Sequence, residues 1–140
     1  RQYPEGLPIG LIPLGDCVIA LNPLYGQGMT SAIVQADLLH QSLSALQTSS
    51  FKAQELADRH GPVVNNFSAA PWKRSVLGDT IFHEATGDIP KKLDAWRKEE
   101  LALNTLAASD ASVADLLFQV SQFAESPEKL SELLRVRNNF

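Results

Sequence analysis

The chain has 140 residues, of which 44% are hydrophobic, and a formal net charge of −4. This length allows one domain or part of a larger one, and the hydrophobic content excludes a disordered chain. The acidic balance argues against a nucleic-acid binder, and no apolar run reaches the roughly 20 residues that span a membrane. Cys17, the single cysteine, excludes an internal disulfide and favours a reducing, cytoplasmic location; we expect it to be buried and inert.

The first apolar segment, residues 11–14, predicts one short buried strand that ends at Gly15. Pro13 within it indicates an edge position, because proline cannot donate a ladder hydrogen bond. No second strand is evident, and a lone strand leaves its backbone groups without partners. We therefore expect the partner sheet to lie outside this chain.

A helix is predicted from Gly28 to about Leu46, where apolar residues recur with a period near 3.6. They form one stripe, which consists of Met29, Ala32, Ile33, Ala36, Leu39, Leu43 and Leu46. We expect this stripe to face the same absent sheet and hence to be exposed here. His40 lies at the edge of the stripe and is assigned no cofactor role.

The remainder of the chain is predicted to be mostly helical, so the fold class is mainly α with one short strand. A helix that begins near Phe51 is expected to break at Gly61-Pro62. The following stretches are expected to be a strained helix at 63–77, a loop at 78–90, and helices at about 91–108, 112–124 and 127–136. Ser109 or Asp110 is a suitable N-cap for the second of these last three helices.

The chemistry-bearing motif is Gly15-Asp16, followed by Pro23 and then by Gly26-Gln27-Gly28-Met29. A carboxylate at a buried strand end needs donors, and a polyol hydroxyl would supply them; capping the local turn is the alternative. Glycine lets backbone N–H groups approach a flat ligand, and a helix N-terminus attracts negative charge. A plain glycine-rich turn is the alternative for these residues.

This motif resembles the Gly-Asp segment of FAD-dependent monooxygenases of the aromatic hydroxylase type. The resemblance implies that the Asp16 carboxylate binds a ribityl hydroxyl of FAD. It also implies that the turn at Pro23 belongs to the cofactor site and that the backbone of Gly26, Gln27, Gly28 and Met29 faces the N1 and O2 edge of the flavin. It also implies a reduced flavin that transfers one oxygen atom from O2 to a small organic substrate, with NAD(P)H as possible electron donor. Residues 1–47 would then belong to an incomplete α/β FAD-binding domain, and residues 48–140 to a helical C-terminal region in which Pro71-Trp72 extends a weaker resemblance.

Some features depart from that family. Its G-x-G-x-x-G for the adenine half of FAD lies near the N-terminus, and this chain contains no such segment, so we expect it to need a missing N-terminal FAD-binding segment and to be inactive alone. Ile19 and Gln35 stand where many of these hydroxylases carry His and Asp, which leaves the substrate class open. No side chain is identified as a catalytic acid or base, and no histidine has metal-ligand spacing. A flavin-dependent dehydrogenase or reductase fragment, or a non-catalytic helical interaction module, remains the alternative.

Overall fold

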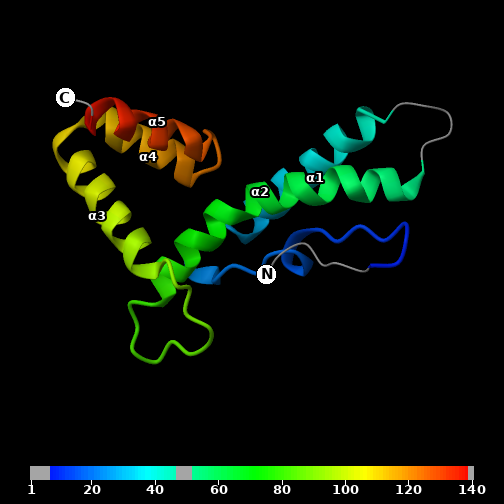
Figure 1. The fold of residues 1–140 in the computed structure, drawn as a ribbon, viewed down its shortest axis with the longest axis horizontal. Helices are drawn as coiled ribbons and strands as arrows, with labels where there is room; N and C mark the ends of the chain where they lie inside the picture. Colours follow the sequence, from blue (N-terminus) through cyan, green and yellow to red (C-terminus); the bar gives the residue numbers. More distant parts are fainter. Residues whose placement is uncertain (1–6, 47–51, 139–140) are drawn as a thin grey trace. The chain divides into compact units, whose positions relative to one another are not determined.

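The computed structural model describes residues 7–46 and 52–138, and these form a helical protein without strands (Figure 1). The α-helices are α1 (Gly28–Ser44), α2 (Ala53–Asp79), α3 (Leu93–Ser109), α4 (Ala111–Ser121) and α5 (Pro127–Asn138). Two short 3-10 turns precede them, η1 (Gly15–Cys17) and η2 (Pro23–Tyr25). The mainly α class is confirmed. Within the described ranges no helix is both long enough and apolar enough to cross a membrane.

The chain divides into two compact units, residues 1–79 and residues 80–140. The first unit contains η1, η2, α1 and α2, and the second contains α3, α4 and α5. This division groups α2 with the segment that carries the Gly-Asp motif. It does not test where an FAD-binding domain would end, so the boundary at residue 47 stays a prediction.

The strand expected at residues 11–14 does not form. Leu14 has extended backbone angles (φ −138°, ψ 162°), yet no strand is assigned there. A strand needs a neighbour to complete its hydrogen bonds, and the described part of the chain offers none. The segment leads instead into η1, so that Asp16 lies in a tight turn.

The break expected at Gly61-Pro62 was also wrong, because α2 runs uninterrupted from Ala53 to Asp79 and passes through Pro71 as well. The clash that normally excludes a helical residue before proline involves its Cβ atom. Gly61 has no Cβ, so this clash is absent before Pro62, whereas Ala70, which precedes Pro71, keeps its Cβ and the structure gives no such relief there. Proline has no backbone N–H, so Pro62 cannot donate to the carbonyl of Asp58, four residues earlier. Both residues are exposed, so water can hydrate that carbonyl.

The second unit has its own apolar core, where α4 packs against both α3 and α5. Its buried residues are Leu103, Val120 and Leu130, one from each helix. The predicted cap is confirmed, because the Asp110 carboxylate accepts hydrogen bonds from the backbone N–H of Ser112 (2.9 Å) and Val113 (3.3 Å). Residues 80–92, predicted to be largely loop, connect to the start of α3 without a helix.

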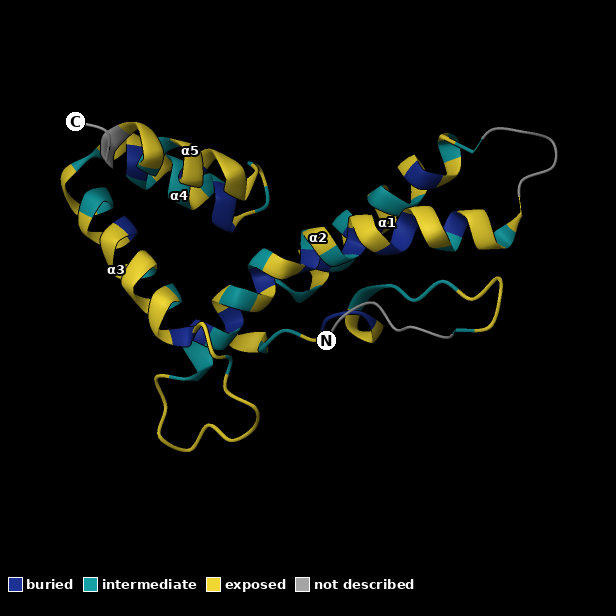
Figure 2. Ribbon diagram, viewed as in Figure 1, coloured by how far each residue is buried: buried dark blue, intermediate teal, exposed yellow. Residues whose placement is uncertain are grey.

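In the first unit, α1 turns its polar side inward. Its buried residues are Ser31, Gln35 and Ser42, and α1 packs against α2 and η1. The apolar stripe faces solvent: Met29 is 81% exposed and Ile33 is 69% exposed (Figure 2). The predicted exposure is therefore confirmed for Met29, Ile33, Ala36 and Leu43, whereas Ala32, Leu39 and Leu46 are half-buried. The inner face of α1 relies on hydrogen bonds between polar side chains.

His60 of α2 is completely buried in this unit, with Nδ1 3.4 Å from Ser42 Oγ of α1. Burial lowers the pKa of the imidazole below its ordinary value near 6.5. The unfolded chain therefore binds a proton at a higher pH than the folded chain does. The contribution of neutral His60 to the free energy of unfolding is therefore fully present above pH 6.5, and it decreases as the pH falls below that value.

We expect the free energy of unfolding, measured by urea denaturation, to decrease between pH 7 and pH 5.5, with a slope of at most about 1.4 kcal/mol per pH unit from this group. His60→Gln should flatten this dependence, because glutamine does not titrate. His40→Gln is the matched control, since His40 is exposed on α1. A profile that follows His40 and ignores His60 would contradict the assignment.

Candidate functional site

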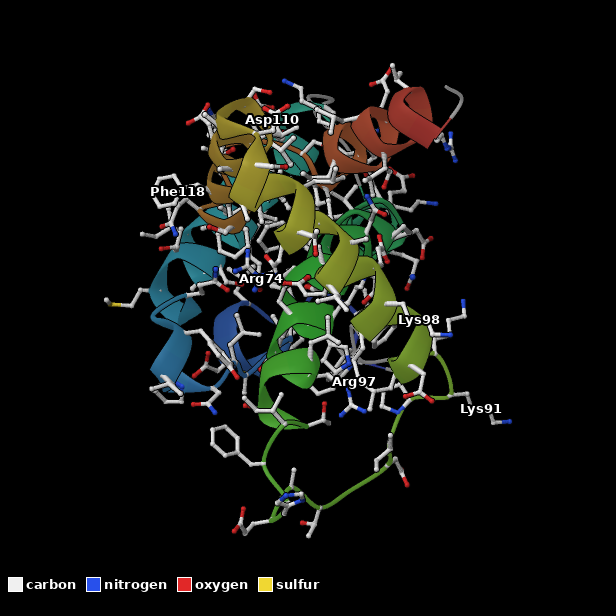
Figure 3. The ribbon with its side chains drawn as sticks, turned by 90° about the vertical axis from the view of Figure 1, so that its left-hand side faces the viewer. Arg74, Lys91, Arg97, Lys98, Asp110 and Phe118 are labelled. Atoms are coloured by element: carbon white, nitrogen blue, oxygen red, sulfur yellow. The ribbon has the colours of Figure 1, made fainter. Side chains whose placement is uncertain are left out.

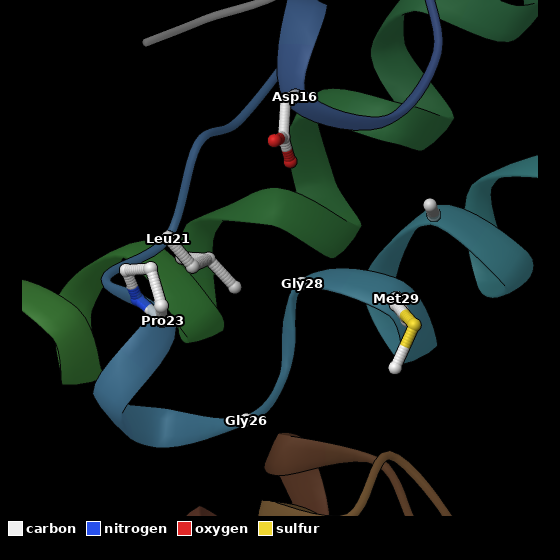
Figure 4. Close-up of a pocket in the computed structure, with 7 residues that line it drawn as sticks. Asp16, Leu21, Pro23, Gly26, Gly28 and Met29 are labelled. Carbon is white, nitrogen blue, oxygen red and sulfur yellow. The ribbon is translucent and has the colours of Figure 1, made fainter.

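The first unit contains a cavity of about 490 Å³ at the start of α1 (Figure 4). It is lined by Asp16, Leu21, Pro23, Gly26, Gly28, Met29 and Ala32. Five of the six residues predicted from the motif thus lie around one cavity. The sixth, Gln27, is the N-cap of α1 and does not line it.

Asp16 is exposed in η1 and not at a buried strand end, so the expected burial of this carboxylate was wrong. It makes no hydrogen bond or ion pair with any residue that the structure describes. The turn-cap alternative is therefore not realised within these residues. Figure 4 shows the carboxylate directed into the space between η1 and the start of α1. Its neighbour Cys17 is exposed too, contrary to expectation.

Two glycines leave the wall of this cavity open. A Cβ atom added at Gly26 or Gly28 would meet nothing within 4 Å. Gly26 ends η2 with φ +64°, a left-handed conformation that glycine adopts without strain. Gly28 begins α1, and the side chain of its N-cap residue, Gln27, does not cap the helix, so backbone N–H groups of the first turn are available to a ligand.

The Asp16 turn is attached to α1 through Gln35, the residue that stands where many hydroxylases carry Asp. The backbone N–H of Gly15 donates to Gln35 Oε1 at 2.8 Å, and Gln35 Nε2 donates to Ser31 Oγ at 3.2 Å. Gln35 is fully buried, so these bonds are shielded from water. They hold Asp16 at a defined position relative to the first turns of α1.

The η2 side of the cavity is attached to the end of α2 by Asp79. Its Oδ1 accepts hydrogen bonds from Asn22 Nδ2 (2.8 Å) and from the Tyr25 hydroxyl (3.0 Å), and its Oδ2 accepts one from Ser75 Oγ (3.2 Å). Burial, followed by the hydrogen bond and the charge of Asp79, raises the pKa of Tyr25, so the phenol stays a donor. We call Asn22, Tyr25, Ser75 and Asp79 the Asp79 clasp.

Sequence reasoning missed several of these residues. Leu21 and Ala32 complete the cavity lining, and Ala32 could have been placed there because it lies one helical turn after Gly28. The Asp79 clasp joins residues 54 and 57 positions apart, so no local pattern indicates it. The second Gly-Asp pair, Gly78-Asp79, was the available signal, and it was interpreted only as a loop.

Two curated proteins are similar to this chain. It is 36% identical over 90 residues to Protein Rv3254 of Mycobacterium tuberculosis, an alignment that covers 63% of this chain and 19% of that protein. It is 27% identical over 141 residues to the digeranylgeranylglycerophospholipid reductase of Sulfolobus acidocaldarius, which covers 89% of this chain and 31% of the reductase. No family model matches, and no solved structure gives a significant match.

The chain thus spans less than a third of the length of either relative. The second relative is a reductase by name, and a reductase belongs to the same broad class, the oxidoreductases, as the proteins that the Gly-Asp segment resembles. Nothing in it is specific to a monooxygenase.

Proposed function

We propose that the first unit is the FAD-binding segment of a flavin-dependent oxidoreductase, with the cavity around Asp16 and Gly28 as the flavin side of the site. The observation that carries the proposal is the convergence of five motif residues on one cavity of about 490 Å³. This volume lies within the range of small-molecule sites. It is formed by elements within the first unit alone.

The chemistry of the lining fits a flavin. Asp16 offers a carboxylate without a partner among the described residues, which suits a ribityl hydroxyl donor. The sides of Gly26 and Gly28 that a Cβ would occupy are empty, so a flat ring can approach the backbone. The first turn of α1 presents N–H groups and the positive end of the helix dipole, which favour the negative edge of a reduced flavin.

When bound, FAD would supply the redox chemistry, as cofactors generally do. The residues of this chain would hold and orient it. Asp16 would accept a hydrogen bond from the cofactor, and the backbone N–H groups at residues 28–30 would donate to it, while Pro23 and Met29 line the cavity. Fixed donors stabilise such charge without reorganisation.

The reaction we propose is a monooxygenation, a hydroxylation or epoxidation of a small organic substrate, as the Gly-Asp resemblance implies. NAD(P)H is the proposed electron donor. A flavin-dependent reductase is the second candidate, favoured by the distant similarity to a reductase over 89% of this chain. The two differ in the fate of O2, because only a monooxygenase transfers an oxygen atom into its product. Labelled O2 and mass spectrometry of the product separate them.

Replacing Asp16 by alanine in the full-length protein that carries this chain tests the site. We expect Asp16→Ala to weaken FAD retention about 10- to 150-fold, the range for losing a hydrogen bond to a charged group. The measurement is flavin absorbance per protein after purification, with circular dichroism to confirm folding.

His40→Ala is the control, since His40 is exposed on α1 and does not line the cavity. It should retain all of its flavin. If Asp16→Ala keeps its flavin while His40→Ala loses it, the proposed site is on the wrong residues.

A further inference from the structure

The second unit contains a cavity of its own, about 500 Å³, between the loop at residues 80–90 and the start of α3. Its lining residues come from residues 80–97 of this unit. The volume is typical of small-molecule sites. None of the residues that line the Asp16 cavity contributes to it.

One wall of this cavity is apolar and lacks a covering side chain. Phe82 is 53% exposed and Ile89 is 65% exposed, although both line the cavity, and Leu93 is buried at the start of α3. Apolar surface that remains in contact with water gains free energy when an apolar occupant covers it. A ligand with an apolar body therefore fits this wall.

The polar side of the cavity is dominated by Arg97. Its Nη2 donates to the backbone carbonyl of Thr80 at 3.0 Å, and its Nη1 lies 3.6 Å from Asp94 Oδ1. These contacts orient the guanidinium, which has five N–H donors, so further donors remain for a ligand. Figure 3 shows Arg97 beside the loop, whereas Lys98 extends away from it.

Lys91 adds a further positive charge to the lining of this cavity, and His83 adds an imidazole ring that can form a hydrogen bond. The first turn of α3 contributes the positive end of its dipole, because its N-cap, Lys92, makes no side-chain hydrogen bond to it. Among the residues that line this cavity, the acidic one is Asp94, and its carboxylate forms an ion pair with Arg97.

From this arrangement we infer that the cavity binds a small organic anion, a carboxylate or phosphate attached to an apolar body of one or two rings. Arg97 holds the anionic group, and Phe82 and Ile89 contact the apolar body. A neutral ligand of the same shape leaves the Arg97 donors unused. This site is independent of the FAD site proposed for the first unit.

Calorimetric titration of this chain with 1-naphthoate, an aromatic carboxylate, tests the inference, with neutral 1-naphthalenemethanol as the matched ligand. We expect saturable 1-naphthoate binding with a dissociation constant below about 1 mM, the range for a ligand of this size. The neutral ligand should bind about 5-fold more weakly, because an exposed ion pair contributes this much at most. Absence of saturable binding, or equal binding of the two ligands, would overturn the proposal.

Paired variants locate the site. Arg97→Gln should lower 1-naphthoate affinity to that of the neutral ligand and leave the neutral ligand unchanged, whereas a merely structural effect would weaken both. Lys98→Gln, on the same helix but outside the lining, should change neither. Phe82→Ala should weaken both ligands about 5-fold or more, while Ile81→Ala, also an exposed apolar residue but outside the lining, should not. Equal effects within either pair would show that the ligand does not occupy this cavity.

Discussion

Gly28→Val is expected to abolish flavin retention in the full-length protein, with a loss larger than the effect of Asp16→Ala and more than about 100-fold in affinity. The side of Gly28 that a Cβ would occupy is open, with nothing within 4 Å. A Cβ there meets no atom of the described chain outside its own helix, so we expect the loss to report the ligand and not the fold. Its branched side chain would occupy the space through which the flavin ring approaches the backbone.

Flavin absorbance per protein measures this effect, and circular dichroism checks that α1 persists. Thr30→Val is the matched control, because Thr30 is an exposed residue in the same helical turn that does not line the cavity. Gly28→Ala should give an intermediate loss. Full flavin content in Gly28→Val would mean that the ring lies elsewhere.

Gly78→Ala is expected to destabilise the first unit by about 1 to 3 kcal/mol, the usual cost of overpacking. Helix propensity alone predicts the opposite sign, since alanine is favoured over glycine within a helix by about 1 kcal/mol. The structure reverses this expectation, because a Cβ at Gly78 would lie 2.7 Å from Cζ of Tyr25 and closer still to its hydroxyl oxygen. The phenol would have to move and would lose its hydrogen bond to Asp79.

A double-mutant cycle in urea denaturation checks this explanation. When Tyr25→Ala has already removed the ring, Gly78→Ala should be neutral or slightly stabilising. The coupling between the two positions is the quantity to measure. If Gly78→Ala costs the same with and without the Tyr25 ring, the contact is not the cause.

Local patterns predicted what depends on local structure. The period near 3.6 placed the start of α1 at Gly28, and the side chain of Asp110 caps α4 as its sequence position suggests. The segment at residues 11–14 failed because strand formation depends on a neighbour that its own sequence does not specify. Pro62 failed as a helix breaker in part because Gly61 has no Cβ to clash with the proline ring, which is a property of the pair and not of proline alone.

The candidate site shows the same division. Residues 15–29 are close in sequence, and their spacing was enough to bring five predicted residues to one cavity. The exposure of Asp16 was not predicted, because it follows from η1 replacing a strand. Gln35 and Asp79, which fix the two sides of the cavity, act through contacts 20 and 57 residues away, and no single-sequence motif carries such information.

The Asp79 clasp has a consequence for the order of folding. Closing a loop between Asn22 and Asp79 costs chain entropy, and that cost is offset only when α2 has already carried Asp79 into place. We therefore expect the turn that contains Gly26 to become ordered after α2. Amide exchange in this turn should then follow local opening at the Asp79 end of α2, so that the turn nearest the proposed cofactor opens more readily than the helix that holds it.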